Sequence, residues 1–269
     1  MSDNIVDLPA PQAGPTEGPA IAVRGLGKRF GDLIAVKGID LDVPRGSFFG
    51  LVGPNGAGKT TTLSMVTGLL RPDAGQAFVL GRDVWSDPVA TKRLLGVLPD
   101  GLKLFDRLTG LQLITYAGLL RGLSRELASE RAAELVAALG LTEAQGKLVV
   151  DYSAGMTKKV TLASALVHAP RVLVLDEPFE AVDPISAATI RRILSGFVES
   201  GGTVVLSSHV MDLVERICTH VAVISDGLVL TAGELDDVRG GRSLEERFVD
   251  LVGGSTEVVG LSWLRTSSD

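Results

Sequence analysis

Aromatic residues, cysteine and long apolar runs are all scarce in this sequence of 269 residues. Only 4% of the residues are aromatic, so leucine, valine, isoleucine and alanine must fill most of any core. The single cysteine, Cys218, excludes an internal disulfide bond and is typical of a reducing compartment. No run of about 18 uninterrupted apolar residues occurs, so we expect no membrane-spanning helix. With 45% hydrophobic residues, the chain can still bury the core of one large α/β domain or two small ones.

The sequence also lacks an excess of basic residues and a recognisable secretory signal. The 26 Lys and Arg residues against 32 Asp and Glu residues give a net charge of −6, which argues against nucleic acid as a partner because such proteins carry a basic surface. The N-terminus lacks the basic and then apolar pattern of a secretory signal. Residues 1–19 contain four prolines and little apolar content, so we expect a disordered lead-in there, and a C-terminal tail at 254–269.

Apolar patterning divides the remaining sequence into three parts. Alternation at 21–26 and 34–43 predicts antiparallel strands near the N-terminus, and the pattern over 88–139 is mostly helical. After Tyr152, strand and helix patterns alternate, which implies parallel strands joined by helical crossovers in an α/β fold. The further predicted strands are 47–52, 76–81, 171–176, 203–208, 221–225 and 227–233, and the further predicted helices are 59–69, 154–168, 185–199, 210–217 and 243–253.

A glycine-rich stretch follows the predicted strand 47–52 and precedes a predicted helix. GPNGAGKTT (53–61) fits the phosphate-loop pattern G-x-x-x-x-G-K-[ST]. Its glycines let the backbone curl so that N–H groups point inward, its lysine can reach the β- and γ-phosphates, and its first threonine offers a hydroxyl to Mg²⁺. The alternative is a glycine-rich turn with a solvated lysine. The predicted nucleotide ligands are Gly53, Pro54, Asn55, Gly56, Ala57, Gly58, Lys59, Thr60 and Thr61, with Lys59 also catalytic and Thr60 also a metal ligand.

An acidic motif ends another predicted strand. RVLVLDEP (171–178) runs four apolar residues into Asp176 and Glu177. Two carboxylates at the end of a buried strand are costly unless they meet a cation, so Asp176 is predicted to hold Mg²⁺ directly or through water. Glu177 would polarise the attacking water as general base. Taken alone, the motif could also be a strand followed by an acidic helix cap.

The stretch between these motifs narrows the class of NTPase. YSAGM (152–156), here called the signature, lies shortly before RVLVLDEP, and with it the chain resembles the ATP-binding subunits of ABC transporters. That family carries LSGGQ at this point: Ser153 and Gly155 match, and the other three positions differ as they do in its drug- and polymer-export branches. The resemblance covers residues 20–253. It implies a P-loop NTPase core with a mostly parallel sheet, an N-terminal antiparallel β subdomain and a helical subdomain at about 88–165.

The resemblance assigns roles to several further residues. Phe30 matches the aromatic residue that stacks on adenine, although it could also be an ordinary core phenylalanine. Asp183, in AVDP, matches the key residue of the loop that crosses between two subunits, although Asp-Pro alone is simply a helix start. His209 follows a predicted strand, matches the family's switch histidine and is the third predicted catalytic residue. His168 and His220 lack such a context and are expected to be structural.

One position differs from the family in a way that leaves its role open. Asp100 stands within GVLPDGLKLF, where the family carries glutamine. Aspartate is shorter and charged: it could touch Mg²⁺ or a water molecule, but it also adds negative charge near the γ-phosphate. Asp100 is therefore predicted either as a nucleotide and metal ligand or only as a hinge toward the partner.

The resemblance also explains why a serine and a glycine open the helix at the signature. In the family this helix points away from its own phosphate loop, and the residues matching Ser153 and Gly155 meet the γ-phosphate of ATP held by a second copy or a homologous cassette. Lys158 and Lys159 would be solvated, or would steer the phosphates at longer range. ATP would thus bridge two chains, and hydrolysis would release them.

The implied function is that of an ATP-binding and ATP-hydrolysing subunit that powers a membrane transporter. A separate membrane-spanning permease would dock on the helical region 88–139, with Asp100 to Arg107 at its edge. The permease would hold the chain in the cytoplasm, peripheral on the inner face of the cell membrane. SLEERFVDLVGG (243–254) resembles the closing helix of two-component exporter ATPases, which favours export.

Two alternatives remain open at this point. A soluble non-transport ABC ATPase, such as a single-cassette iron–sulfur assembly ATPase, carries the same motifs. A regulatory cassette that only binds ATP would explain Asp100 and the altered signature, but the intact Lys59, Asp176, Glu177 and His209 argue against it.

Overall fold

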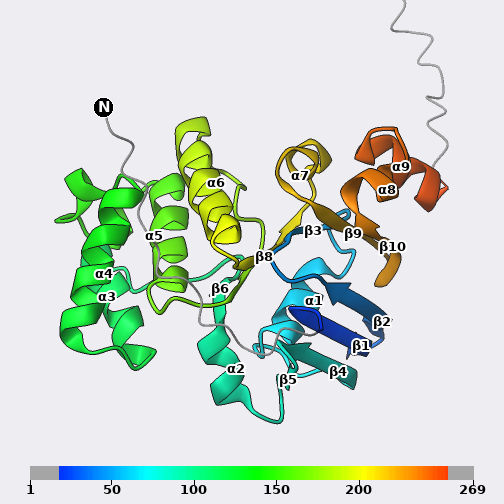
Figure 1. Ribbon diagram of the computed structural model, residues 1–269, viewed down its shortest axis with the longest axis horizontal. Helices are drawn as coiled ribbons and strands as arrows, with labels where there is room; N and C mark the ends of the chain where they lie inside the picture. The colour runs from blue at the N-terminus through cyan, green and yellow to red at the C-terminus, as the bar shows by residue number, and fades with distance from the viewer. Residues whose placement is uncertain (1–17, 254–269) are drawn as a thin grey trace, which may run out of the picture.

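Two β-sheets organise the computed structural model, which describes residues 18–253 (Figure 1). In spatial order, the larger sheet consists of β10 (Leu228–Glu234), β9 (His220–Ser225), β3 (Phe48–Val52), β8 (Thr203–Ser208), β7 (Val172–Leu175) and β6 (Leu95–Leu98). The smaller sheet consists of β2 (Leu33–Val43), β1 (Ile21–Phe30), β4 (Ala74–Val79) and β5 (Arg82–Asp83). The helices are α1 (Lys59–Val66), α2 (Pro88–Leu94), α3 (Gly110–Leu120), α4 (Arg125–Ala138), α5 (Ala154–Leu166), α6 (Pro184–Glu199), α7 (Met211–Ile217), α8 (Leu235–Arg239) and α9 (Leu244–Val252), with short 3₁₀ helices at Thr142–Ala144 and Val149–Asp151. Apart from Gly18 and Pro19, the predicted lead-in and the predicted tail at 254–269 lie outside the described residues.

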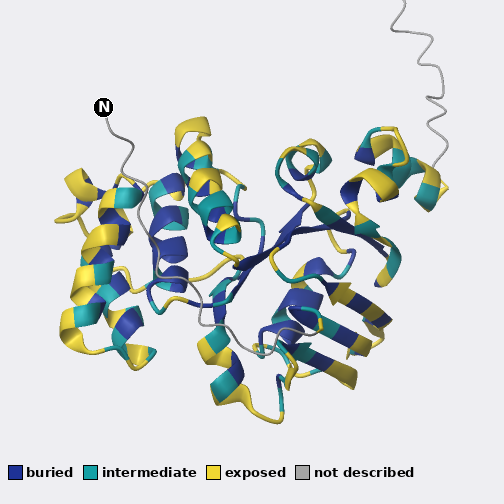
Figure 2. Cartoon of the chain, viewed as in Figure 1, coloured by how far each residue is buried: buried dark blue, intermediate teal, exposed yellow. Residues whose placement is uncertain are grey.

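The larger sheet is parallel except at one edge. β3 pairs in parallel with β8 and β9, and β7 pairs in parallel with β6 and β8, whereas β10 is antiparallel to β9. Every residue of β3, β7 and β8 is buried, as expected for parallel strands that are covered on both faces (Figure 2). Parallel strands end at the same edge of a sheet. The loops that carry GPNGAGKTT, DEP and His209 follow β3, β7 and β8, so they meet at that edge.

Two hydrophobic clusters cover opposite faces of this sheet. Phe48 and Val52 of β3 belong to a cluster with residues of α5, α6 and α7, whereas Phe49 and Leu51 belong to one with α1 and the smaller sheet. This alternation follows from the two-residue period of a strand. Aliphatic side chains fill most of both clusters, and Phe48, Phe49 and Phe197 are the aromatic residues among their buried members.

The smaller sheet has the predicted antiparallel strands near the N-terminus, but its first strand is longer than predicted. β1 continues to Phe30, and its register against β2 shifts between Val23 and Leu26. Gly25 lies within this irregularity with a φ of +56°, a backbone angle that glycine adopts at little cost. The pairing then resumes and places Phe30 opposite Leu33 at the end of the strand.

Helices α3, α4 and α5 pack together at one end of the molecule, on the left of Figure 1. Each begins at a hydroxyl residue, because Thr109, Ser124 and Ser153 each accept a hydrogen bond from a first-turn N–H group. The mostly helical pattern predicted for 88–139 is wrong at β6, which also falls inside the predicted helical subdomain. A four-residue apolar run such as LGVL fits a strand or a helix equally well, and only its pairing with β7 distinguishes them.

The C-terminal part contains one helix that the apolar pattern does not predict. α8 follows β10 and has only five residues, too few to show a helical period. α9 begins at a capping box in which Ser243 and Glu246 exchange hydrogen bonds. Within residues 18–253, no helix combines the length and the apolar character needed to cross a lipid bilayer.

Candidate functional site

The loop after β3 has backbone requirements that only glycine meets. A Cβ atom on Gly53 would lie 2.1 Å from the carbonyl oxygen of Ile224, and one on Gly58 would lie 2.6 Å from that of Ala35. Gly58 also has a φ of +102°, in the left-handed region. No side chain of the described residues caps α1. Its first N–H groups therefore point into the loop as donors for an anion.

Lys59 lies inside this loop rather than in solvent. Its side chain is 6% exposed, and Nζ donates to the carbonyl oxygens of Gly53 at 2.7 Å and Pro54 at 3.2 Å. Nζ also lies 3.7 Å from Oε1 of Glu177. The alternative of a solvated lysine is therefore wrong, and the ammonium group joins the loop after β3 to the acidic loop after β7.

Asp176 is a buried carboxylate at the end of β7, with 4% exposure. It accepts a hydrogen bond from the hydroxyl of Ser207 on β8, and its N–H donates to the carbonyl oxygen of Leu98 at 2.7 Å. The alternative of an acidic helix cap is wrong, because α6 begins only at Pro184 and is capped by Asp183. Among the described residues this buried carboxylate has one hydroxyl partner, so it suits a hard cation such as Mg²⁺.

The backbone of Glu177 has a conformation that is unusual for a residue with a side chain. Its φ is +44°, in the left-handed region, which costs roughly 1–2 kcal/mol. Its N–H donates to Oγ of Ser207 at 2.9 Å, and its carbonyl oxygen accepts from Nζ of Lys158 at 2.8 Å. The sequence does not identify Ser207 or Lys158 as site residues, although both lie close to predicted ones in the chain. Such strain, held by neighbouring groups, is typical of functional sites.

The carboxylate of Glu177 lies between two nitrogen-bearing side chains. Its Oε1 is 3.1 Å from Nδ1 of His209 and 3.7 Å from Nζ of Lys59. Neither contact has hydrogen-bond geometry, so Oε1 is a buried oxygen without a hydrogen-bond partner among residues 18–253. Such an atom is suited to accept a hydrogen bond from a water molecule. The three predicted catalytic residues therefore meet, although they follow three different strands.

Ser153 and Gly155 lie at the start of α5, against the start of α6. Oγ of Ser153 accepts a hydrogen bond from the N–H of Met156 at 3.3 Å. A Cβ atom on Gly155 would lie 2.7 Å from Oδ2 of Asp183 and 2.9 Å from Oγ of Ser186, so glycine permits this close approach. The side chains of Ser153 and Asp183 are exposed. The signature and the AVDP loop of one chain thus form one continuous surface.

Residues 36–180 match the sequence profile of the ABC transporter family. The chain belongs to this family. It is 39% identical over 234 residues to the daunorubicin/doxorubicin resistance ATP-binding protein DrrA of Streptomyces peucetius, across 86% of this chain and 71% of that protein. It is 35% identical over 211 residues to the linearmycin resistance ATP-binding protein LnrL of Bacillus subtilis, across 78% and 68% of the two chains. A solved structure of an ATP-binding subunit of an ABC transporter superposes with a TM-score of 0.80 and 27% identity, covering 87% of this chain and 99% of that one.

This ABC cassette is an ATP-binding subunit of a transporter, and it is an ATPase. The resemblance inferred from the signature and the P-loop NTPase fold are confirmed. Subunits of this family dimerise and pair with membrane permeases. The alternative of a soluble non-transport ATPase is not favoured, because the relatives are resistance and transporter subunits.

Two predicted nucleotide ligands of the cassette lie on its surface. Phe30 is 48% exposed at the end of β1, and Nζ of Lys28 lies 5.6 Å from the centre of its ring. The alternative of a core phenylalanine is therefore wrong, and the ring is accessible for stacking. Asp100 is exposed in the turn after β6. Its role as a ligand of nucleotide or metal stays a prediction.

Of the two roles expected for the lysines of the cassette's signature helix, the solvated one is wrong, and steering of the phosphates stays a prediction. Lys159 is 8% exposed. Lys158 is half-buried, and its Nζ donates a hydrogen bond to the carbonyl of Glu177. The reason is the position of α5, which packs against α3, α4, α6 and β6 and so has little surface left for solvent.

The other histidines of the cassette have local contacts away from this site. Nε2 of His168 lies 3.0 Å from the carbonyl oxygen of Leu95. Burial and, next, the nearby charge of Arg121 lower the pKa of His168 to about 4, so this ring is neutral at pH 7. Nδ1 of His220, at the start of β9, lies 3.0 Å from Oγ1 of Thr219. These contacts fit the structural roles expected for both residues.

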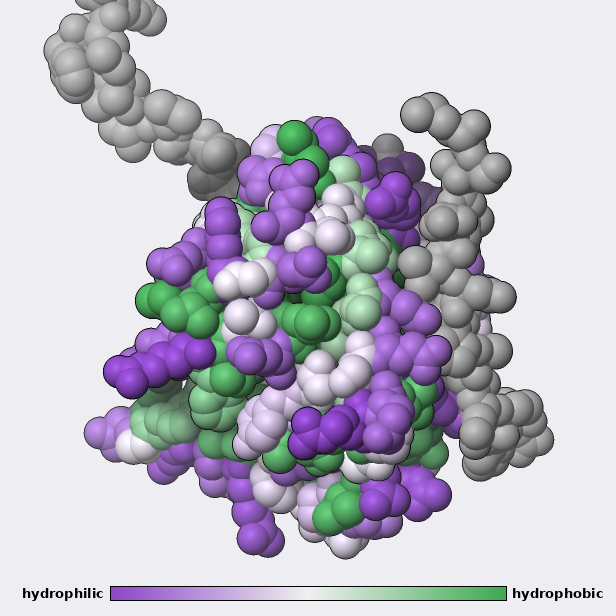
Figure 3. All heavy atoms as spheres, turned by 90° about the vertical axis from the view of Figure 1, so that its left-hand side faces the viewer, coloured by the Kyte–Doolittle hydropathy of each residue, from purple (hydrophilic) through white to green (hydrophobic). Residues whose placement is uncertain are grey.

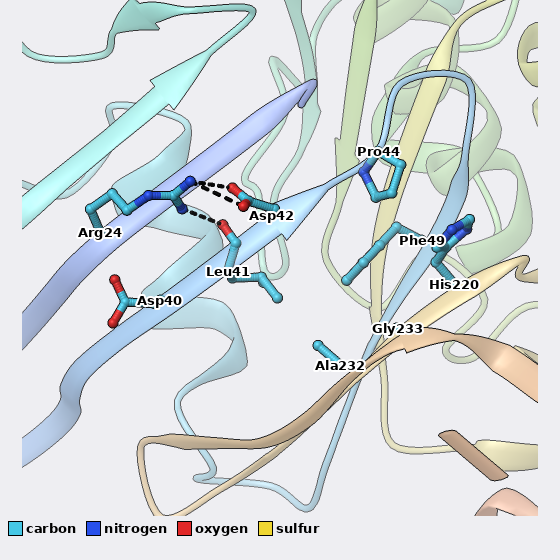
Figure 4. A pocket seen from close by; sticks show the side chains of 9 residues that line it. All are labelled: Arg24, Asp40, Leu41, Asp42, Pro44, Phe49, His220, Ala232 and Gly233. Carbon is cyan, nitrogen blue, oxygen red and sulfur yellow. Dashed lines mark hydrogen bonds and ion pairs between the residues drawn. The ribbon is translucent and has the colours of Figure 1, made fainter. Parts of the chain in front are cut away.

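A cavity of about 390 Å³ lies near the start of β3, where Phe49 and His220 contribute to its wall (Figure 4). Arg24 points toward Asp42 in this cavity, and the two groups approach to 2.7 Å, so they neutralise one another. None of the predicted nucleotide ligands lines it. The cavity is therefore separate from the nucleotide site, which lies at the other end of the strand.

Proposed function

We propose that two copies of this chain, or this chain and a homologous cassette, enclose two ATP molecules and hydrolyse them to drive a transporter. The observation that carries the proposal is the meeting of Lys59, Glu177 and His209 around one buried oxygen atom. These groups can bind a terminal phosphate and activate water at the same point.

ATP would bind along the phosphate loop. Lys59 would exchange the carbonyl groups of Gly53 and Pro54 for β- and γ-phosphate oxygens, and the first turn of α1 would add its N–H donors. The exposed ring of Phe30 would stack on adenine, which is worth about 1–3 kcal/mol for a base on an aromatic side chain.

Magnesium would complete this site. The hydroxyl of Thr60 and the carboxylate of Asp176 would hold Mg²⁺, with Ser207 orienting the carboxylate and Asp100 as a further candidate ligand. Bound there, the ion would neutralise charge on the transferred phosphate.

Glu177 is the proposed general base. Its unpartnered Oε1 would accept a hydrogen bond, and then a proton, from the attacking water. His209, whose Nδ1 lies 3.1 Å from this oxygen, would contact the γ-phosphate beside it. Lys59, at 3.7 Å, would stabilise the charge that develops on the phosphate.

The exposed residues at the start of the signature helix, Ser153 and Ala154, support the dimer. Ser153 and the N–H of Gly155 would contact the γ-phosphate of ATP on the partner chain, and Asp183 would lie at the same interface. ADP lacks the phosphate that bridges the two surfaces, so the nucleotide would change the affinity of the two chains for each other.

An apolar patch on the helical region supports docking of a separate membrane-spanning permease. Leu102, Phe105 and Tyr116 are exposed, and the rings of Phe105 and Tyr116 meet edge to face at 5.7 Å. Hydrophobic side chains group among polar ones on the face that α3 and α4 present (Figure 3). Exposed apolar groups of this kind mark interaction sites. Docking here would hold the chain in the cytoplasm, on the inner face of the cell membrane.

The names of the relatives support export as the direction of transport. DrrA and LnrL are named for resistance to daunorubicin, doxorubicin and linearmycin, and expulsion of a toxic compound gives resistance to it. α9, within SLEERFVDLVGG, resembles the closing helix of two-component exporter ATPases. The permease, rather than this chain, would select the cargo.

The substitution Glu177→Gln tests the catalytic part of this function. We expect it to abolish Mg-ATP hydrolysis and to leave ATP binding intact, since glutamine keeps the shape but cannot accept the proton. Phosphate release and nucleotide binding by the purified chain measure the two effects. Glu199→Gln, an exposed residue at the end of α6, is the control. Equal hydrolysis by wild type and Glu177→Gln would contradict the assignment.

The same variant tests the dimer. With ATP bound and hydrolysis blocked, Glu177→Gln is expected to elute from gel filtration as a dimer. A monomer at every ATP concentration, both alone and with the permease, would contradict the shared site.

A further inference from the structure

The carbonyl group of Glu177 is held by a residue that the proposed chemistry does not use. Nζ of Lys158 donates to it at 2.8 Å, and the N–H of Glu180 makes a longer contact at 3.3 Å. A hydrogen bond from a charged donor is roughly twice as strong as one between neutral groups. On the other side of the residue, Oγ of Ser207 accepts the N–H of Glu177 at 2.9 Å. Lys158 and Ser207 therefore hold the φ of +44° from both ends.

The direction of the Glu177 side chain depends on this peptide. A non-glycine residue keeps a positive φ only while its surroundings hold it there. If φ changed, the bond from Cα to Cβ would rotate and carry the carboxylate with it. Oε1 would then leave its positions 3.1 Å from His209 and 3.7 Å from Lys59. The hydrogen bond from Lys158 thus bears directly on where the carboxylate points.

Lys158 belongs to the helix that begins at the signature. α5 runs without a break over Ala154–Leu166 and is capped by Ser153. Because consecutive turns of a helix are joined by hydrogen bonds, a displacement of its first turn also displaces Lys158. In the proposed dimer, Ser153 and Gly155 meet the nucleotide of the partner. α5 therefore connects that nucleotide to the Glu177 that serves the chain's own ATP.

We propose that Lys158 is a positioning residue, which aims the Glu177 carboxylate when the partner's nucleotide engages Ser153 and Gly155. The inference rests on the proposed role of Glu177 as general base. Lys158 acts on turnover and leaves nucleotide binding and dimer formation intact, because its ammonium group binds a backbone carbonyl of its own chain.

The test compares Lys158→Met, Lys158→Arg and the control Lys147→Met in the full chain. Methionine keeps the apolar stem but has no donor, arginine keeps a charged donor, and Lys147 is exposed. Steady-state hydrolysis of Mg-ATP gives kcat and KM, and gel filtration with ATP in a Glu177→Gln background measures the dimer.

We expect the kcat of Lys158→Met to fall about tenfold, equivalent to about 1.4 kcal/mol of activation free energy, with little change in KM. Lys158→Arg is expected to recover most of the lost turnover, and Lys147→Met to match wild type. The dimer formed by Glu177→Gln is expected to persist when Lys158→Met is added.

An unchanged kcat in Lys158→Met, or a raised KM alone, overturns the proposal. Loss of the ATP-dependent dimer in the double variant also overturns it, since Lys158 would then act at the interface. If Lys158→Met does not fold, Lys158→Ala replaces it, because alanine also has no donor: a fall in kcat without a change in KM supports the proposal, and an unchanged kcat overturns it. Wild-type hydrolysis by Glu177→Gln would instead refute the proposed function, whatever Lys158 does.

Discussion

The two parts of the nucleotide site on this chain differ in where their polar groups find partners. The side chains of Lys59 and Glu177 are 6% and 12% exposed and contact one another, whereas His209, 39% exposed, contacts Glu177 from the surface. Ser153 and Asp183 are exposed, and each accepts a hydrogen bond only from the first turn of its own helix among the contacts of the described residues. The buried part can exclude water and perform chemistry, whereas the exposed part offers a surface for recognition. In the proposed dimer, one chain would hold the reacting groups and a second chain would enclose them.

Removing the ammonium group of Lys59 from the buried part is expected to have the largest effect on hydrolysis. Lys59→Met deletes the ammonium group that contacts the loop after β3 and Glu177. We expect kcat/KM for ATP to fall by about 100-fold or more, because preorganised positive charge on the phosphate stabilises the transition state. An assay of phosphate release measures the effect, with Lys147→Met as the control. Wild-type turnover in Lys59→Met would break the assignment of chemistry to this part of the site.

The exposed part is tested by Gly155→Ala against Gly196→Ala, two glycines within helices. A Cβ atom at 155 would lie 2.7 Å from Oδ2 of Asp183, whereas one at 196 would meet nothing within 4 Å. We expect Gly155→Ala to abolish the ATP-dependent dimer. Its turnover is expected to fall about tenfold, equivalent to about 1.4 kcal/mol of activation free energy, while its binding of ATP is unchanged. Gly196→Ala is expected to gain up to about 1 kcal/mol of stability. Equal loss of ATP binding in Gly155→Ala would show that the two parts are not separable.

A hydroxyl that links two carboxylate residues of the buried part is expected to affect stability as well as turnover. Ser207→Ala removes the partner of the Asp176 carboxylate and of the Glu177 N–H. We expect a loss of about 1–3 kcal/mol in the free energy of unfolding and a lower kcat, because buried groups are left unpaired. Ser208→Ala is the matched control, since within residues 18–253 Oγ of Ser208 bonds only to the backbone of Val210. Urea denaturation measures both variants, and equal losses would contradict a special role for Ser207.

The smallest expected effect is on the stability of the fold and comes from His168, which lies away from the nucleotide site. The pKa of His168 is lowered from 6.5 to about 4, so between these values the unfolded chain binds more protons than the folded one. Stability is therefore full above the unfolded pKa and falls as the pH drops from 6.5 toward 4. We expect a loss of about 1 kcal/mol at pH 5.5 relative to pH 7. Denaturation at several pH values measures this slope, and an equal slope in His168→Gln would contradict its origin in His168.

The site residues that could be predicted from the sequence have roles that follow from a contiguous stretch of chain. GPNGAGKTT sets a backbone shape by its own glycines, and Asp176 and His209 follow strands that are recognisable by their apolar runs. Ser207 and Lys158 act across the fold. Ser207 contacts Asp176, 31 positions away, and Lys158 contacts Glu177, 19 positions away. These contacts depend on the pairing of β8 with β7 and on the packing of α5, which no local pattern contains.

The elements of the fold also fall into those that a local stretch of sequence predicts and those that depend on distant contacts. The parallel core could be predicted because VLVL and TVVLSS are strands with turn or loop signals on both sides. β6 could not, because a short apolar run beside helices has no period of its own. The burial of Lys159 was also missed, since a charged pair after a helix start normally faces solvent, and only the crowding of α5 by its neighbours prevents this.

The last residue of β6 has a mechanical consequence. The carbonyl of Leu98 accepts the N–H of Asp176 at 2.7 Å, and the chain then runs directly into the turn of Asp100 and on to Phe105. A permease that pulls on this segment would transmit its force to the peptide of Asp176, the proposed magnesium ligand, through this hydrogen bond and the pairing of β6 with β7. The short segment from Leu98 to Phe105 would then couple movement of the permease to cleavage of the nucleotide, without a separate linker domain between them.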